Sequence, residues 1–379
     1  MSVSSPLLAK GKIQSPAGLV RGHSSKVRFC PSSNYPVAFH KLLTKISTIM
    51  VLLCVLAGVC AIAYNELSIH HYRAIAGIPG KLYNIGGHPM HLYCTGEGSP
   101  TVVLSSGLGD DFTGWARVQP ALSRQTRVCS YDRAGFGWSE SRPGVQDANT
   151  IASELHQLIE AASVQKPFVL VGHSISGLYL RSYAAHFPGD LAGLVFVDGA
   201  TPLQDDRVPK ELVKIQEDQR RQMPWQKLLM MLGWYRLQGA CTSIPPGFDA
   251  YSAWIKADSC VPSQMDAMEN ELDAERVSGE ETIHAGPFGD LPVLILSRDP
   301  TVLSSNWPAS VAKANSVVWN QMQEESKALS TQSIRIIAKR SDHYIQNDRP
   351  DLVIQEITTL VARIRNHQPF PHNKSTSTE

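Results

Sequence analysis

Acidic residues are absent from the first 45 residues of this 379-residue chain, and charge of either sign is absent from residues 46–64. Residues 1–45 hold seven Lys or Arg, so the remainder of the chain has a formal charge of −6. Such a remainder excludes a general basic surface, and we expect no nucleic-acid partner. As a helix, residues 46–64 would span about 28 Å, close to the hydrocarbon thickness of a bilayer, which predicts a transmembrane helix.

The charges around this run also predict where the rest of the chain lies. Positive flanks stay in the cytoplasm, and Lys41 and Lys45 precede the run. A retained signal anchor with an extracytoplasmic C-terminal domain is therefore the favoured interpretation. Two alternatives stay open. Ala61-Ile62-Ala63 matches a signal-peptide cleavage site, which would give a secreted protein, and the Ser-rich residues 1–45 are also typical of an organelle transit peptide.

Motifs that hold nucleotides or metals are missing as well. Gly135-x-Gly137 is followed by Glu140 where a dinucleotide fingerprint needs its third glycine. The sequence has no Walker loop and no His-Glu-x-x-His motif, and we interpret the pair His70-His71 as solvated. We expect neither a cofactor nor a metal site.

A serine near the middle of the chain has the setting of a nucleophile. Residues 168–179 read Phe-Val-Leu-Val-Gly-His-Ser-Ile-Ser-Gly-Leu-Tyr, which predicts a buried strand, a sharp turn at Ser174 and a helix. A serine hydroxyl is a weak nucleophile, so it needs a base and backbone N–H groups for an oxyanion beside it. A strand-to-helix turn provides this setting. The usual Gly-x-Ser-x-Gly pattern is met except that Ser176 replaces the last glycine and Gly177 comes one place later.

From about residue 81 to residue 366 the chain resembles the α/β-hydrolase superfamily, in the branch with a helical cap. Beside the serine turn, the resemblance rests on residues 101–109, a strand followed by Ser-Gly-Leu-Gly, and on residues 128–139, a strand followed by Asp-x-x-Gly-x-Gly-x-Ser. It implies an oxyanion hole formed by the N–H groups of Leu108 and Ile175.

The resemblance also implies the order of a catalytic triad, which is serine, acid and then histidine. Asp132 precedes Ser174, so we interpret it as structural. Among the later histidines only His343 closely follows a late strand-like run, residues 334–338, which makes it the expected base.

Two carboxylates compete for the role of the acid that orients the histidine. Asp299 follows the buried run at residues 293–296, where the family usually keeps its acid. Asp198 ends the preceding strand-like run, residues 194–197, where some family members place it; otherwise it is a turn or cap residue. We prefer Asp299 and keep Asp198 as the alternative.

Strand-like runs alternate with helical stretches, which predicts an α/β fold with a mostly parallel sheet and helices on both faces. The resemblance gives this sheet eight strands. The expected parts are a basic N-terminal segment (1–45), a transmembrane helix or signal anchor (46–64), a hydrolase core (81–200 and 291–366), a helical cap (201–290) and a disordered tail (367–379).

These features predict a membrane-anchored serine hydrolase, similar to carboxylesterases and lipases, that cleaves an ester, thioester or amide of a small acyl substrate through an acyl-enzyme on Ser174. A serine at the turn argues against the dehalogenase and epoxide-hydrolase branches, which use aspartate. A lyase, a cofactor-free peroxidase and a non-catalytic ligand-binding protein of the same fold remain as alternatives, because the fold does not choose the substrate.

Four of the seven cysteines are candidates for disulfide bonds. The resemblance implies that the strand with Cys94 lies beside the strand with Cys129. Cys241 and Cys260 are a second candidate pair within the cap. Otherwise the thiols pack as small apolar side chains. A bridge fits an oxidising compartment outside the cytoplasm.

Overall fold

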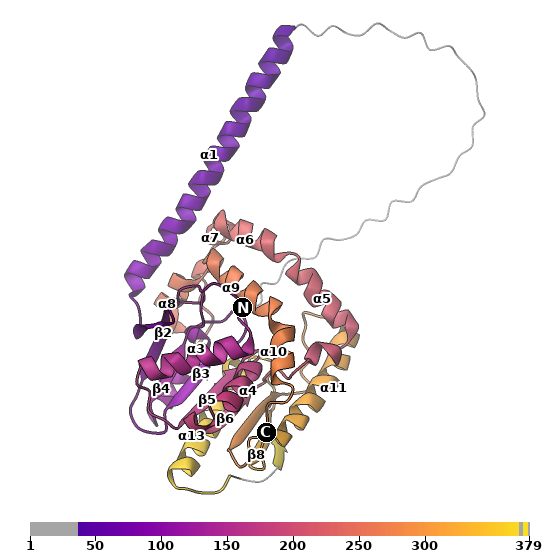
Figure 1. Cartoon of the computed structure of the whole chain (residues 1–379). Helices are drawn as coiled ribbons and strands as arrows, with labels where there is room; N and C mark the ends of the chain where they lie inside the picture. The colour runs from indigo at the N-terminus through magenta and orange to yellow at the C-terminus, as the bar shows by residue number, and fades with distance from the viewer. Residues whose placement is uncertain (1–36, 371–373, 378–379) are drawn as a thin grey trace, which may run out of the picture. The chain divides into compact units, whose positions relative to one another are not determined.

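The computed structural model describes residues 37–370 and 374–377 (Figure 1), so most of the basic segment, residues 1–36, lies outside the described residues. Helix α1 (Val37–Ala76) is long and apolar enough over Phe39–Ala76 to cross a membrane, and its apolar window has no buried residue. The chain divides into one unit that ends at Val55 and another that begins at Leu56. The apolar N-terminal helix that the sequence predicts is present, and its second half belongs to the unit that holds the sheet.

The described part of the chain contains one sheet of nine strands in the order β1-β2-β4-β3-β5-β6-β7-β8-β9. Strand β2 pairs antiparallel with β1 and with β4, and every other pairing is parallel, as predicted for an α/β fold. The strands are β1 (Lys81–Ile85), β2 (His88–Thr95), β3 (Val102–Ser105), β4 (Val128–Tyr131), β5 (Phe168–His173), β6 (Leu191–Val197), β7 (Val293–Arg298), β8 (Ser333–Ala338) and β9 (Lys374–Ser377).

The ninth strand corrects the expected count of eight strands, and it places residues 374–377 of the expected disordered tail (367–379) in the sheet; residues 371–373 and 378–379 lie outside the described residues. Strand β9 pairs in parallel with β8 at the edge of the sheet. Ser375 accepts a hydrogen bond from Lys327 Nζ (2.9 Å) and donates one to the Glu324 carboxylate (3.0 Å). A polar segment can extend an edge in this way because the backbone hydrogen bonds of the ladder do not depend on apolar side chains.

Helices cover both faces of the sheet, as predicted. Helices α3 and α4 pack on one face, where Leu158 and Tyr183 join a cluster that includes Val103. Helix α13 packs on the other face, where Ile357 joins a cluster that includes Val102. Consecutive residues of β3 are thus buried on opposite faces, which is why the strand is apolar throughout. The helices of the core are α2 (Gln119–Leu122), α3 (Ala148–Ala161), α4 (Ser176–His186), α11 (Ala309–Glu325), α12 (Ile345–Asp348) and α13 (Pro350–Arg365).

A helical segment, residues 201–290, separates β6 from β7, and we call it the insertion. It contains α5 (Lys210–Arg220), α6 (Met223–Met231), α7 (Trp234–Leu237), α8 (Ser252–Asp258), α9 (Pro262–Asp273) and α10 (Glu275–Thr282). Helices α6, α7 and α9 are drawn above the strands in Figure 1. The insertion also braces the core, because Ala148 N, at the start of α3, donates to Ser278 Oγ of α10 (2.9 Å).

Both candidate cysteine pairs are disulfide-bonded. Cys94 and Cys129 lie directly opposite each other in the ladder between β2 and β4, and Cys241 is bonded to Cys260 within the insertion. The sheet order explains the first bridge, because β4 and not β3 is the neighbour of β2.

Candidate active site

Ser174 lies at the turn between β5 and α4, as the sequence predicts. Its φ of +54° is in the left-handed region, which is costly for a residue with a side chain and is held here by the surrounding structure. Ser174 O accepts hydrogen bonds from Gly177 N (2.8 Å) and Ala200 N (2.7 Å). A Cβ at Gly177 would lie 2.5 Å from Ala200 O, so the glycine that comes one place late lets the turn pack against the end of β6.

Ser176, which stands where the sequence pattern usually has glycine, has a structural partner. Its hydroxyl is fully buried and donates to Ser106 O (2.6 Å), in the loop after β3, and it also lies 2.8 Å from Ser105 Oγ. The departure from the pattern therefore ties the serine turn to the expected oxyanion loop. Nothing in the sequence indicated this contact, since residues 105 and 176 are far apart in the chain.

His343 lies in the loop after β8, and its imidazole connects the serine to an acid. Nε2 of His343 lies 2.8 Å from Oγ of Ser174, and Nδ1 lies 2.6 Å from Oδ2 of Asp198. These are the distances that a base needs to take a proton from the serine while a carboxylate holds the other ring nitrogen. The structure thus brings together Ser174, His343 and Asp198.

Asp198 is the alternative acid of the sequence analysis, and it is fully buried at the end of β6. Its Oδ1 accepts hydrogen bonds from Trp319 Nε1 (2.9 Å) and from the backbone N–H of Arg298 (3.0 Å), and Arg298 Nε lies 2.7 Å from Oδ2. Burial alone would raise the pKa of Asp198, but the neighbouring Arg298 and His343 outweigh burial and lower it. Asp198 is therefore held as a carboxylate.

Asp299 is the acid that the sequence favours, and the structure corrects that expectation. Its Oδ1 accepts from the N–H (2.9 Å) and the hydroxyl (2.7 Å) of Thr301, and its Oδ2 accepts from Arg340 N (2.9 Å). These bonds join the end of β7 to the loop that carries His343, and they direct the carboxylate to Thr301 and Arg340 instead of the imidazole. Burial raises the pKa of Asp299, but the bonds from Arg340 and Thr301 lower it overall.

The two expected oxyanion residues are neighbours. Ile175 follows Ser174 directly, and the side chain of Leu108 packs against the buried cluster that contains Ile175 and Leu178. Arg133 holds the backbone of the Leu108 loop from below, donating to Ser106 O (2.6 Å) and Gly107 O (2.9 Å).

Arg133 also connects this loop to the insertion. Its guanidinium forms a buried, bidentate ion pair with Glu271 of α9, with distances of 2.5 Å and 3.0 Å. Met268, one turn earlier on α9, lies over the same loop, since a Cβ at Gly109 would be 2.9 Å from its sulfur. The sequence does not indicate this pair, because only the fold shows that α9 reaches the oxyanion loop.

Asp132, interpreted as structural, makes contacts that fit that role. Its carboxylate accepts from the backbone N–H of Phe112 (2.7 Å) and of Trp138 (3.0 Å), and it lies 2.7 Å from Nδ1 of the buried His91.

His173, just before the serine, supports the histidine loop. It is buried, and its Nε2 lies 3.1 Å from His343 O. Burial, with His343 nearby, places the pKa of His173 well below its ordinary value, so the ring is neutral and its Nε2–H donates to that carbonyl.

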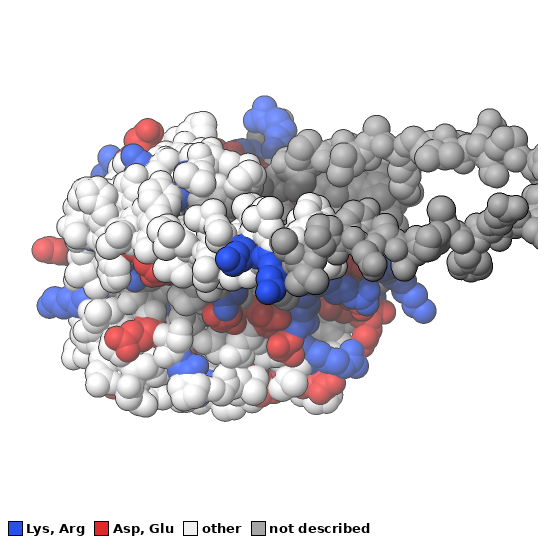
Figure 2. Space-filling view, turned by 90° about the horizontal axis from the view of Figure 1, so that it is seen from above, with Lys and Arg blue, Asp and Glu red and all other residues white. Residues whose placement is uncertain are grey.

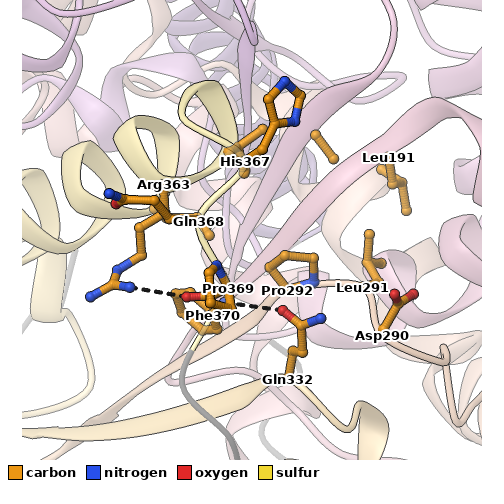
Figure 3. A pocket seen from close by; sticks show the side chains of 13 residues that line it. Leu191, Asp290, Leu291, Pro292, Gln332, Arg363, His367, Gln368, Pro369 and Phe370 are labelled. Carbon is orange, nitrogen blue, oxygen red and sulfur yellow. Dashed lines mark hydrogen bonds between the residues drawn. The ribbon is translucent and has the colours of Figure 1, made fainter.

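A hollow of about 510 Å³ lies elsewhere on the sheet (Figure 3). Its walls include Leu191, Pro292 and Gln332, which lie at the N-terminal ends of β6, β7 and β8. Ser174 follows the C-terminal end of the parallel strand β5, so the hollow lies at the opposite edge of the sheet. Ligands of such sheets bind beyond the carboxyl ends of the strands, and we do not assign the chemistry to this hollow. Over the described residues, no group of three His, Cys, Asp or Glu side chains is arranged to hold a metal.

Comparisons with known proteins agree with this geometry. Residues 100–350 match the family described as alpha/beta hydrolase fold. An uncharacterized protein of Bacillus subtilis, YbdG, is 22% identical over 333 residues, which is 86% of this chain and 98% of that protein. Two further relatives match through less than a third of their own length.

Two solved structures share the fold. A putative lipase from Acinetobacter baumannii is 19% identical with a TM-score of 0.55, over 80% of this chain and 97% of that one. A membrane phospholipase A, described as a bacterial virulence factor, is 17% identical with a TM-score of 0.51, over 86% of this chain and 99% of that one. At these identities the likeness extends to the fold and not to the substrate.

Proposed function

The chain belongs to the alpha/beta hydrolase family, and we propose that it is a serine hydrolase, anchored to a membrane by residues 46–64, that cleaves esters through an acyl-enzyme on Ser174. One observation carries the proposal. The Ser174 hydroxyl, the His343 imidazole and the Asp198 carboxylate form a continuous chain of contacts at 2.8 Å and 2.6 Å, at the turn where the family keeps its nucleophile.

In the proposed reaction His343 Nε2 takes the proton of Ser174 as Oγ attacks the substrate carbonyl carbon. Asp198 holds the other ring nitrogen as a donor, which fixes the tautomer and stabilises the imidazolium. The carbonyl oxygen becomes an oxyanion, for which we assign the N–H groups of Leu108 and Ile175. His343 then returns the proton to the leaving group, the acyl group stays on Ser174, and water activated by His343 releases it.

We propose ester bonds ahead of thioesters and amides. An alcohol leaves more readily than an amine, and the names of structural relatives include a lipase and a membrane phospholipase. The family match does not by itself select among these bonds.

The proposed location is a membrane with the hydrolase domain outside the cytoplasm. Two observations support it. The apolar helix α1 follows a positively charged segment, and the domain contains two disulfide bonds, which persist in oxidising compartments.

A substrate screen tests the function. Full-length protein in detergent is assayed against acyl esters of graded chain length, the matching thioesters and amides, and an epoxide, with Ser174→Ala as the control. We expect hydrolysis of at least one ester that the control loses. Equal rates for the two proteins, or no turnover of any ester by the wild type, would contradict the proposal.

A further inference from the structure

The second half of α1 makes specific contacts with the insertion. Arg236 of α7 donates from Nε to Oδ1 of Asn65 (3.0 Å), which is fully buried. Gly233, between α6 and α7, packs directly on the helix, because a Cβ there would lie 3.2 Å from the ring of Tyr64. The turn between α6 and α7 is therefore held at the level of residues 64–65.

Arg73, two turns further along α1, forms a second set of contacts between the helix and the rest of the domain. Its Nη2 donates to Gly137 O in the core (2.7 Å) and to the buried carboxylate of Asp258 in the insertion (3.1 Å), and its guanidinium lies over the Trp138 ring at 5.1 Å. These contacts join the helix to both the core and the insertion.

The insertion exposes large apolar side chains next to this contact, and we call them the α6–α7 surface. They are Trp225 (63% exposed), Leu228 (39%), Trp234 (49%) and Leu237 (69%). Four large apolar side chains on two short neighbouring helices form a patch, and such patches mark sites of interaction.

Charged side chains are scarce in the segment that carries this surface. Residues 222–239 contain Lys227 and Arg236 and no acid. Lys227 is paired with Asp266 of α9, and Arg236 with Asn65. Figure 2 shows Lys, Arg, Asp and Glu side chains scattered among uncharged ones on the face seen from above.

We propose that the α6–α7 surface rests in the interfacial layer of the bilayer that α1 crosses, so that the enzyme takes its ester from the membrane. This inference rests on the proposed membrane anchor. The uncharged run ends at Tyr64, and Asn65 and Glu66 follow, so the edge of the hydrocarbon layer falls there. Gly233 packs on Tyr64, which puts the α6–α7 surface at that edge, the depth at which Trp side chains are enriched.

Contacts made by α9 connect the α6–α7 surface to the candidate active site. Lys227 of α6 pairs with Asp266 of α9, and on the same helix Met268 lies over Gly109 while Glu271 holds Arg133 beneath the oxyanion loop. Helix α9 therefore connects α6 with the loop that packs beside the serine turn. A long-chain ester embedded in the membrane is the substrate class that this arrangement fits.

Tryptophan fluorescence tests the surface directly, because helix α1 contains no tryptophan and all seven lie outside it. The full-length protein is placed in lipid nanodiscs with ordinary or brominated acyl chains, which quench only tryptophans in contact with them. We expect bromination to lower the total tryptophan emission, and by no more than the part that Trp225 and Trp234 contribute among the seven tryptophans. The double variant Trp225→Phe with Trp234→Phe should lose this quenching, and Trp307→Phe, changed in the core, should keep it.

Two results would contradict the proposal that the α6–α7 surface contacts the bilayer. Wild-type emission that bromination leaves unchanged, while aqueous acrylamide quenches Trp225 and Trp234, would place them in water. Shielding of both from lipid and acrylamide alike would indicate that a second copy of the chain covers them. Ser174→Ala should quench as the wild type does, so this measurement does not depend on catalysis.

A second measurement tests the substrate class. Replacing Trp234 and Leu237 by Ser should lower the hydrolysis of a long-chain ester in nanodiscs about tenfold or more, because apolar contact with the membrane is lost. A short water-soluble ester should be cleaved at the wild-type rate. Val317→Ser, at a valine of α11 that is 65% exposed, is the matched control and should change neither rate. Equal losses on both esters would contradict delivery from the membrane, whereas a wild type inactive on every ester would contradict the proposed function alone.

Discussion

Oδ2 of Asp198 lies 2.6 Å from Nδ1 of His343, although 145 residues separate the two in the chain. Asp198 follows β6 and His343 follows β8, so the strand between them, β7, does not supply the carboxylate that contacts the histidine. It supplies Arg298 instead, whose backbone N–H and guanidinium both contact the Asp198 carboxylate. This arrangement keeps the acid ionised and aimed at the histidine.

The first prediction separates the two carboxylates. Asp198→Asn should lower turnover by about ten-thousand-fold, because an amide at this place favours the wrong tautomer of the histidine. Asp299→Asn should lower it far less, since the carboxylate of Asp299 accepts from Thr301 and Arg340 and not from His343. Ester turnover and melting temperature are measured for both variants. The opposite ranking, in variants that melt like the wild type, would return the acid role to Asp299.

The second prediction concerns stability against pH at Glu154 of α3. Burial raises the pKa of Glu154 to about 7 even though Arg142, 2.7 Å away, lowers it. The folded state therefore binds a proton more tightly than the unfolded state, whose pKa is near 4.5. The contribution of Glu154 to stability is therefore largest below about pH 4.5 and falls as the pH rises toward about 7.

Glu154→Gln removes the titrating carboxyl group, so the variant should lose less stability than the wild type as the pH rises. Relative to the wild type, the variant should gain stability as the pH rises from 5 to 8, by roughly 3 kcal/mol at most. Melting curves over that range measure the effect. A difference between the two proteins that does not change with pH would show that Glu154 is ionised throughout.

The third prediction concerns the bridge between Cys94 and Cys129. It closes a loop with a sequence separation of 35, so its removal by changing both residues to Ala should lower the free energy of unfolding by roughly 3 to 4 kcal/mol. Denaturant unfolding of the two proteins measures the loss. In wild-type protein from its own compartment, non-reducing peptide mapping should recover the bridged peptides. Two free thiols there would contradict both the bridge and the extracytoplasmic location.

The sequence predicted the class of fold, the turn at Ser174 and the partner His343, because each depends on local patterns. Buried parallel strands are apolar throughout, and a serine at a sharp turn between a strand and a helix is typical of a nucleophile. The family order then left a single strand-following histidine near the end of the chain.

The choice between Asp198 and Asp299 could not be made in the same way. Both follow a buried strand, and what separates them is the direction of the side chain. Asp198 has a φ of +47°, and Trp319 and Arg298 hold its carboxylate toward the site. These partners are more than 90 residues away in the chain, so no local pattern reports them.

Strand β9 and the contact between α1 and the insertion could not be predicted from the sequence either. Lys374–Ser377 has a polar composition typical of a tail, and its pairing depends on the exposed edge of β8. The exposure of Trp225 and Trp234, which are about half exposed or more, also depends on the fold, because apolar residues in a helical segment are usually buried.

Covalent labelling of Ser174 is the most direct test of the central claim, that this serine is an activated nucleophile. The full-length protein is treated with a fluorophosphonate, and the modified residue is identified by mass spectrometry. We expect the label on Ser174, none on Ser174→Ala, and much slower labelling of His343→Ala and Asp198→Asn, because the hydroxyl is activated through that chain of contacts. A label that persists in Ser174→Ala, or a wild-type Ser174 that does not react, would contradict the account.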